Sequence, residues 1–316
     1  MAVSPDQGRS GVCAVIVAYE PNYDHFIELL EECLAQCEGL VLVNNGAPLA
    51  LPSFTHGHVK HIQSRGNIGL AAAQNLGVAW AAAHDYPYVW FIDQDSWPAA
   101  GLVQTLRLAF EELESTHASP AAVGPYLVDH RDGVATPFVR FTVGGVAHYH
   151  PCAHSANIPC DFLIASGMLT SVARFHVIGP WEEALFIDNV DLEWSFRARA
   201  QGFQCFGIST ARLSHTLGDA VARFSLLGRT HSLYFHAPRR QYYMMRNRIA
   251  LYRRPYIPWT WKLQDLPRAL VKTLLFTFGV RPRRENARYL LKGAIDGFLS
   301  RLGPYPEKPC LEETTW

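Results

Sequence analysis

The chain has 316 residues, 49% of them hydrophobic, and its 28 Lys and Arg residues balance 28 Asp and Glu residues. This length suffices for one large α/β domain with an appendage, or for two domains, and the zero net charge argues against a nucleic-acid partner. The charges are unevenly distributed, because fifteen basic and only three acidic residues lie between His236 and Arg301. A basic stretch rich in aromatic residues favours contact with an anionic surface or a phosphate-bearing ligand.

Cysteine usage and the lack of long apolar segments bear on the compartment. The seven cysteines include no Cys-x-x-Cys pair, which is typical of a reducing environment. The N-terminal residues show no apolar signal segment, and no apolar run is long enough to cross a bilayer. We therefore expect a cytoplasmic protein.

Strand and helix patterns alternate through the N-terminal third of the chain. Continuous apolar runs predict buried strands at 12–19, 40–45 and 88–93, and HVKHIQ at 58–63 is a candidate for a further strand. Apolar residues at helical spacing predict helices at 26–37, 69–83 and 101–114. This alternation predicts an α/β fold with a mostly parallel, Rossmann-like central sheet and helices on both faces. In such sheets ligands bind beyond the carboxyl ends of the strands.

The rest of the chain changes character twice. Residues 121–170 are strand-like, and a helical pattern that ends at Gly202 precedes a short strand at 203–208. From about residue 238 the patterns are long, helical and basic. We therefore expect two regions, 1–235 and 236–316, of which the second is a helical C-terminal region.

The stretch YVWFIDQDSWP carries the first chemical signal. Asp93 and Asp95 stand at the end of a predicted buried strand, where carboxylates need a partner. An Asp-x-Asp pair at such a point can converge on one hard divalent cation, which also takes phosphate oxygens from a substrate. Alternatively, Asp95 and Ser96 cap the helix that follows.

Several segments in this order resemble those of a known family. The segments are VIVAYEPN, RGNIGLAAAQNLGV, FIDQDS, IGPWEEALFIDNVDLEWSFRARAQGF, SHTLGD, PRRQYYMMRNRIAL and KGAIDGFLSRLG. Together they resemble the family 2 glycosyltransferases of the inverting GT-A type, and most of all the bacterial rhamnosyltransferases that use dTDP-L-rhamnose. The resemblance covers most of the chain and implies a GT-A fold with a catalytic, nucleotide-sugar-binding domain at 1–235.

The resemblance implies a donor site and a metal site. Asp93 and Asp95 would hold Mg²⁺ or Mn²⁺ with the donor diphosphate, and His215 would complete the metal site. Asn44 stands where the family usually has an Asp that accepts a hydrogen bond from the pyrimidine base. The other donor-binding residues implied by the resemblance are Ala18, Tyr19, Glu20, Asn67 and Gly69.

The chemistry also requires a base, because the acceptor hydroxyl must lose its proton during in-line attack. The family places an Asp at the start of a helix with an Arg six residues later, and Asp191 with Arg197 fits that spacing. The resemblance assigns Asp191 as the base, Glu193 as a supporting or acceptor contact, and Asp188 as part of a rhamnosyltransferase variant of the motif. Alternatively, Asp188 and Asp191 cap the helix and favour its N-terminal dipole.

Other side chains are expected around the same pocket. The resemblance places Ser166 and Gly167 near it, and Trp194 could stack on a sugar or pack in the core. Arginine guanidinium groups suit phosphate oxygens, so we expect Arg240, Tyr243 and Arg246 at the leaving diphosphate. Arg239 is not separable from these by sequence, and all could instead form a solvated helical face.

Two further segments allow alternative interpretations. His148, His150, Cys152 and His154 have the composition of a zinc site, but paired ligands at two separated positions are usual there, so we favour a loop that contacts the acceptor. Residues 259–303 mix aromatic and basic side chains. They could lie on a membrane surface, or pack as a helical cap on the catalytic domain.

We therefore predict metal-dependent, inverting transfer of L-rhamnose from dTDP-β-L-rhamnose to a glycan acceptor, in cell-surface polysaccharide biosynthesis. The resemblance implies an acceptor linked to a polyprenyl diphosphate and a peripheral position on the inner face of the bacterial cell membrane. The alternatives are a donor such as UDP-linked galactose, galactofuranose or N-acetylglucosamine, a sugar nucleotidyltransferase, or a non-catalytic membrane-associated binding module.

Overall fold

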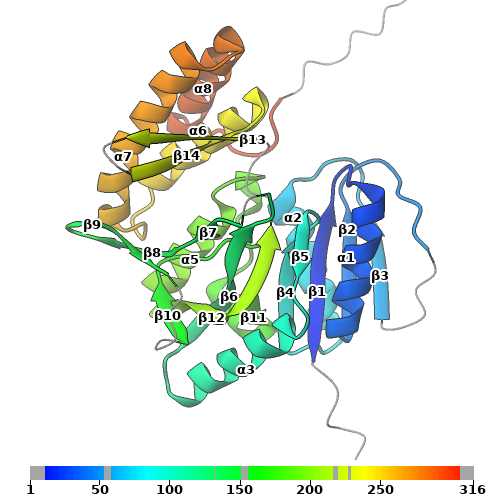
Figure 1. Cartoon of the computed structure of the whole chain (residues 1–316). Helices are drawn as coiled ribbons and strands as arrows, with labels where there is room; N and C mark the ends of the chain where they lie inside the picture. Colours follow the sequence, from blue (N-terminus) through cyan, green and yellow to red (C-terminus); the bar gives the residue numbers. More distant parts are fainter. Residues whose placement is uncertain are drawn as a thin grey trace, which may run out of the picture.

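A central β-sheet with helices on both faces forms the body of the molecule. Three further helices lie beyond the carboxyl ends of its parallel strands (Figure 1). The computed structural model describes residues 11–52, 58–131, 133–150, 156–215, 220–226 and 229–306, with side chains left undescribed at 220–235. The α/β fold class and the helical C-terminal region predicted from the sequence are both confirmed.

The sheet has ten strands in the order β10-β12-β6-β11-β4-β1-β2-β3, with β5 added to β12 and β7 to β6. The pairs β1–β2, β1–β4, β2–β3 and β6–β12 are parallel. The antiparallel strand β11 separates β4 from β6. The strands are β1 (Val12–Ala18), β2 (Gly39–Asn44), β3 (His58–Gln63), β4 (Tyr88–Asp93), β5 (Ser96–Pro98), β6 (Pro120–Asp129), β7 (Ala135–Thr136), β10 (Asn157–Cys160), β11 (Leu169–Ser171) and β12 (Gln204–His215).

Side chains alternate between the two faces of the sheet, as the period of a strand requires. Val15 of β1 and Phe91 of β4 belong to the core beneath α2 (Leu70–Ala83), α4 (Val172–Ile178) and α5 (Val190–Ala200). Ile16 and Ile92 belong to the opposite core, beneath α1 (Tyr23–Gln36) and α3 (Leu102–Ser115). Because both faces are covered, these strands read as unbroken apolar runs in the sequence.

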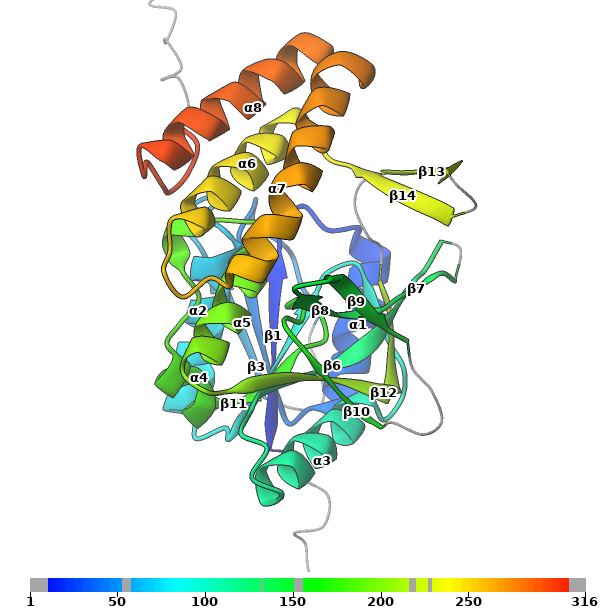
Figure 2. The same ribbon diagram turned by 90° about the vertical axis from the view of Figure 1, so that its left-hand side faces the viewer.

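Three helices follow the sheet, α6 (Pro238–Tyr252), α7 (Trp259–Leu274) and α8 (Arg283–Phe298), with a short π-helical turn, η2 (Leu275–Gly279), after α7. They lie beyond the carboxyl ends of the parallel strands (Figure 2). Two hairpins, β8 (Phe138–Thr142) with β9 (Gly145–Tyr149) and β13 (Ala220–Leu226) with β14 (Arg229–Phe235), stand apart from the main sheet. None of the helices in the described ranges is both long and apolar enough to cross a bilayer.

Candidate active site

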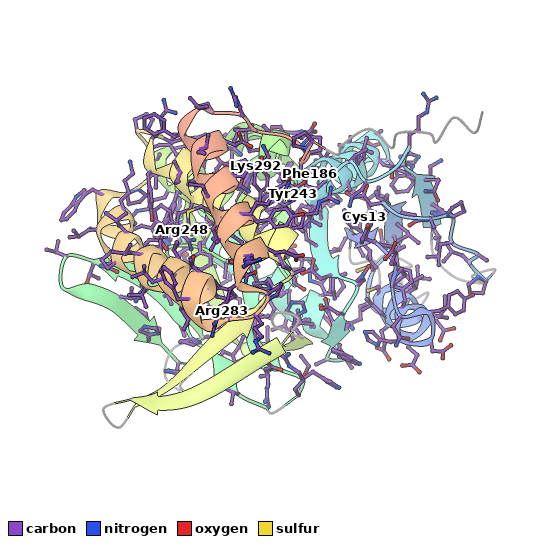
Figure 3. All side chains as sticks on the ribbon, turned by 90° about the horizontal axis from the view of Figure 1, so that it is seen from above. Cys13, Phe186, Tyr243, Arg248, Arg283 and Lys292 are labelled. Atoms are coloured by element: carbon purple, nitrogen blue, oxygen red, sulfur yellow. The ribbon has the colours of Figure 1, made fainter. Side chains whose placement is uncertain are left out.

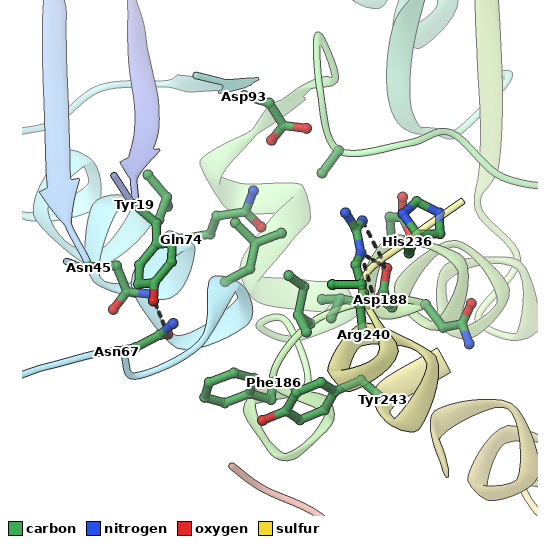
Figure 4. Close-up of a pocket in the computed structure, with 18 of the residues that line it drawn as sticks. Tyr19, Asn45, Asn67, Gln74, Asp93, Phe186, Asp188, His236, Arg240 and Tyr243 are labelled. Atoms are coloured by element: carbon green, nitrogen blue, oxygen red, sulfur yellow. Dashed lines mark hydrogen bonds and ion pairs between the residues drawn. The ribbon is translucent and has the colours of Figure 1, made fainter. Parts of the chain in front are cut away.

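A cavity of about 1130 Å³ opens where the carboxyl ends of β1 and β4 face α6 (Figure 4). Ten of the site residues predicted from the sequence line it, although they come from distant parts of the chain. These ten are Tyr19, Asn67, Asp93, Asp95, Ser166, Asp188, Asp191, His215, Arg240 and Tyr243.

Strand pairing brings His215 to the Asp-x-Asp pair. The end of β12 runs antiparallel to β5, and His215 stands opposite Ser96, the residue after Asp95. The His215 ring lies between the carboxylates, with Nε2 3.8 Å from Asp93 Oδ2 and Nδ1 3.5 Å from Asp95 Oδ1. Ser96 Oγ lies 3.1 Å from His215 Nδ1 and 2.9 Å from Ser166 Oγ, so Ser96 contacts the ring and Ser166 in turn positions Ser96.

These three side chains form a possible metal site. Each of Asp93, Asp95 and His215 offers a ligand atom, and the three atoms lie within 4.8 Å of one another. Two carboxylates and an imidazole leave the remaining coordination positions to water or phosphate oxygens, which suits Mn²⁺ or Mg²⁺. Asp95 does not cap α3, because that helix has Gly101 at its N-cap position and no side-chain cap.

The loop before α5 has an unusual backbone. Phe186, Asp188 and Asn189 all have positive φ angles, of 68°, 65° and 61°, which non-glycine residues adopt only when neighbours hold them there. Asn247 of α6 donates through Nδ2 to the carbonyl oxygens of Leu185, Ile187 and Asp188, at 3.0, 2.7 and 2.8 Å. This clamp sets the direction in which the first turn of α5 leaves the loop.

Asp191 lies in that first turn and points into the cavity. Its pKa is raised to about 6, mainly by burial and to a smaller extent by the nearby Asp188 and Asp93, while the N–H groups of Leu192 and Ala165 oppose the rise. Asp191 Oδ1 also accepts from the Leu192 N–H at 2.8 Å, so this carboxylate interacts with the N-terminus of α5 as well as facing the cavity. Its position near Asp93 means that the base and metal positions predicted from the sequence share one cavity.

Asp188 and Arg240 form an ion pair on the cavity wall, with Arg240 Nη2 3.0 Å from Asp188 Oδ1. Burial raises the pKa of Asp93, and the positive charge of Arg240 opposes that rise, as His215 does more strongly. Arg240 therefore combines a firm anchor on Asp188 with an electrostatic effect on Asp93.

Amide side chains define the opposite rim. Gln94 accepts from the Tyr19 backbone N–H at 2.8 Å and donates to the Tyr19 carbonyl oxygen at 3.0 Å. Asn45 donates to Asn67 Oδ1 at 3.0 Å. These contacts hold Tyr19, Asn45 and Asn67 at the ends of β1 and β2 (Figure 4).

Ala18 and Asn44 lie one residue away from that rim, contrary to the prediction. Ala18 is packed in the core beneath α1. The buried Asn44 donates to Ala47 O at 2.6 Å and to Gln63 Oε1 at 2.7 Å, and its own Oδ1 accepts from the Gly46 N–H. Its amide is therefore engaged in the β2–β3 loop, and Asn45 takes the place at the cavity.

Three other predicted donor or pocket residues also lie outside the cavity lining. Glu20 is exposed. Gly69 has a φ of 89°, and a Cβ there would lie 2.8 Å from Phe186 O, so this glycine is required by the loop before α5. Gly167 has a φ of 85°, and a Cβ there would lie 2.5 Å from the Pro125 side chain. In both cases the close approach is to protein and not to a ligand.

Glu193, Trp194 and Arg246 are structural, again contrary to the prediction. Glu193 is fully buried, forms a bidentate ion pair with Arg197 and accepts from Tyr256. Trp194 is fully buried and donates from Nε1 to Gly179 O at 2.9 Å.

Arg246, which the sequence placed at the diphosphate, is also fully buried and does not line the cavity. It donates to the carbonyl oxygens of Leu185 and Gly303 and lies against the Tyr243 ring. The Arg246 guanidinium group therefore binds carbonyl oxygens inside the protein, next to the contacts that Asn247 makes with the loop before α5.

The histidine-rich segment gives no metal site in the part of the chain that the structure describes. His148 and His150 are exposed, Cys160 is buried in β10, and Cys152 and His154 lie outside the described residues. Among the described residues, Asp93, Asp95 and His215 form the one group of metal-ligating side chains.

Several cavity residues were not among the site residues predicted from the sequence. They are Asn45, Gln74, Gln94, Asn189, His236, Lys272 and Tyr305. Asn45 and Gln94 could have been found from strand parity, since they adjoin the ends of β2 and β4. The others depend on tertiary packing.

Comparisons with known proteins show what the sequence and the fold are similar to. Residues 13–163 match the family model described as Glycosyl transferase family 2. The dTDP-rhamnosyl transferase RfbF of Shigella flexneri is 25% identical over 292 residues, which cover 92% of this chain and 96% of that protein. A crystal structure of GalNAc-T7 with UDP, GalNAc and Mn²⁺ has a similar fold, with a TM-score of 0.53 at 13% identity. That match covers 69% of this chain and 44% of the GalNAc-T7 chain, so it extends over less than half of the larger protein.

Proposed function

We propose that this chain is a glycosyltransferase, in which residues 13–163 match the family 2 model, and that it transfers L-rhamnose from dTDP-β-L-rhamnose to a glycan acceptor with inversion. One observation carries the proposal: the Asp93, Asp95 and His215 group and the Asp191 carboxylate line a single cavity. The choice of donor is supported by the similarity to dTDP-rhamnosyl transferase RfbF.

The proposed chemistry follows from the positions of these groups. The acceptor oxygen attacks the anomeric carbon from the side opposite the diphosphate, its proton passes to Asp191, and dTDP leaves as the bond from carbon to phosphate oxygen breaks. A divalent cation, Mg²⁺ or Mn²⁺, held by Asp93, Asp95 and His215 would offset the charge that develops on the diphosphate. Arg240, fixed by Asp188, adds a second positive charge on that side.

We further propose that the acceptor is linked to a polyprenyl diphosphate and that the protein is peripheral on the inner face of the bacterial cell membrane. One face of α7 is apolar and exposed at Trp259, Leu263, Leu266, Leu270 and Leu274, and Phe278 of η2 is exposed after it. Arg281, Arg283, Arg284 and Arg288 are exposed at the start of α8 and in the turn before it. An apolar stripe flanked by arginines is the pattern of a helix that lies in a lipid interface.

The same helix connects that face to the cavity. Figure 3 looks down on α7 and α8 and shows Arg283 at the start of α8. Lys272 of α7 lines the cavity, so a lipid-linked acceptor at the exposed face would have a short path to Asp191. In this proposal residues 1–235 carry the metal site and the base, and the helical region at 236–316 adds Arg240 on the diphosphate side and brings the acceptor to the cavity.

A donor panel tests the proposal. The protein is incubated with Mg²⁺ or Mn²⁺ and with dTDP-L-rhamnose, UDP-galactose, UDP-galactofuranose or UDP-N-acetylglucosamine, and the shift in melting temperature is measured. We expect the largest shift with dTDP-L-rhamnose and no metal-dependent shift in Asp95→Ala. A larger shift with a UDP-sugar would reject the donor, and a metal-dependent shift retained in Asp95→Ala would reject the metal site.

A further inference from the structure

Gln74 is a buried polar side chain on the cavity wall that nothing above employs. It is 2% exposed, and its Oε1 atom has no hydrogen-bond partner within the described residues. It lies one helical turn after Leu70 on α2, and both residues line the cavity. A buried amide without a partner destabilises a protein, so its presence in the wall of a cavity points to a ligand that supplies the partner.

A second amide on the same cavity has the same property. Asn189 Nδ2 is buried without a partner in the described part of the chain, and Asn189 lines the cavity two residues before Asp191. Its φ of 61° is one that Asn adopts more readily than most residues. An acceptor on Gln74 and a donor on Asn189 together suit hydroxyl groups, which both donate and accept.

The position of Gln74 indicates which part of the donor it meets. Val17 stands opposite Asp93 in the sheet, and both continue the set of β1 and β4 side chains that face α2 and α5. Gln74 projects from α2 into the space between Tyr19 and Arg240 (Figure 4). Gln74 therefore lies beyond the nucleoside rim, towards the side of the cavity that holds Asp188 and Arg240, where the hexose at the far end of the diphosphate would face Asp191.

We infer that Gln74 and Asn189 bind hydroxyl groups of the donor hexose and so help to select the sugar. This inference rests on the proposed function for the identity of the donor. Around Gln74 the wall is apolar, with Val17, Leu70 and Phe186. A hydroxyl misplaced by a different sugar configuration would therefore find no other partner on this wall and would leave the amide unpaired.

The test separates the sugar from the nucleotide. Gln74→Met keeps the side-chain length and removes both polar atoms, and Asn189→Gly keeps the positive φ and removes the amide. We expect each variant to bind dTDP as wild type does and to bind dTDP-L-rhamnose about threefold to tenfold more weakly, by calorimetry with Mg²⁺ present. Gln36→Met is the matched control, since Gln36 Nε2 is also buried without a described partner but Gln36 lies outside this cavity.

The outcomes are distinguishable. Equal loss of dTDP and dTDP-L-rhamnose affinity would make Gln74 a nucleotide contact, and unchanged affinity for both would remove it from the donor site, so either result overturns the inference. Failure of the wild-type protein to prefer dTDP-L-rhamnose over dTDP-linked sugars of other configuration would instead reject the proposed donor. A melting temperature of Gln74→Met that equals or exceeds that of wild type, as expected when an unpaired buried amide is removed, excludes misfolding as the cause.

Discussion

At the scale of single residues, Asp191 shows a conflict between stability and chemistry. A base near neutral pH is most effective when its pKa lies close to the working pH, and burial raises the pKa of Asp191 to about 6. The same burial makes the ionised carboxylate unfavourable in the folded protein. The residue that serves the proposed reaction should therefore weaken the fold at neutral pH.

Asp191→Asn tests the proposed role of Asp191 as the base. We expect transfer to fall by at least about a hundredfold, because no other carboxylate takes the acceptor proton, while the affinity for the nucleotide sugar is retained. In the wild-type protein kcat/KM should decline as the pH falls through about 6, where Asp191 becomes protonated. Loss of donor binding in the variant would contradict the role of base.

The effect of Asp191 on the stability of the fold changes with pH in a definite direction. Because the pKa is about 6 in the folded protein and about 3.9 in an unfolded chain, the contribution of Asp191 to stability is complete below the lower value and is lost as the pH rises through the upper one. Asp191→Asn should therefore melt at a higher temperature than wild type at pH 8. The difference should shrink at pH 5, and a destabilised variant at pH 8 would show that the carboxylate contributes packing or hydrogen bonds instead.

At the scale of elements, the loop before α5 depends on α6. Three positive φ angles are held by a buried Asn247 that donates to three carbonyl oxygens, and the neighbouring Arg246 donates to Leu185 O at 2.8 Å. The cost of such backbone angles is about 1–3 kcal/mol for each residue. Contacts between the loop before α5 and helix α6, about 60 residues further along the chain, thus decide where Asp188, Asn189 and Asp191 point.

Asn247→Asp should break this clamp, since a carboxylate cannot donate to the carbonyl oxygens that Asn247 now binds. Asn286→Asp is a matched control, because Asn286 is also buried and donates to Phe276 O and Val280 O at 3.3 and 3.1 Å, away from the cavity. Both variants should lower the melting temperature. At a temperature where both are folded, only Asn247→Asp should lose transfer activity while it still binds dTDP, and equal activity in the two would show that the clamp is not needed for catalysis.

The sequence predicts the positions of helices and strands well. It predicts poorly which side chains at the ends of these elements point into the cavity. Asp93, Asp95, Asp191 and His215 carry recognisable motifs and do line one cavity. Ala18 and Asn44 fail by one position, because a single residue moves a side chain to the other face of a strand. Glu193 and Arg246 fail for a different reason: their partners Tyr256 and Leu185 become neighbours only when the helical region packs on the rest.

At the scale of the whole molecule, the cavity lies between two regions with different surfaces. The sheet supplies carboxylates and amides, and α6 and α7 supply Arg239, Arg240 and Lys272. The outer face of α7 is apolar, and arginines are exposed at the start of α8. A polar chemical site and a cationic, apolar surface are thus joined through one helix, which is the arrangement that a lipid-linked anionic acceptor needs.

Vesicle binding tests this arrangement. The protein should sediment with vesicles that contain anionic phospholipid, more weakly with neutral vesicles, and more weakly at high salt, because arginines contact the headgroups while α7 inserts its apolar stripe. Leu266 and Leu270 are 60% and 61% exposed, and the double change Leu266→Glu with Leu270→Glu should reduce sedimentation by about tenfold or more. Transfer to a soluble acceptor should persist, because neither residue lines the cavity.

Leu108→Glu is the control for that variant. Leu108 is 49% exposed on α3, which lies at the end of the molecule opposite α7 and α8 (Figure 2). A general effect of added negative charge would reduce sedimentation in both proteins, whereas an oriented contact reduces it only when α7 is changed. If the α7 variant sediments as wild type does, or if it loses a self-association that wild type shows without vesicles, the exposed face binds something other than lipid, and the acceptor must reach Asp191 by another route.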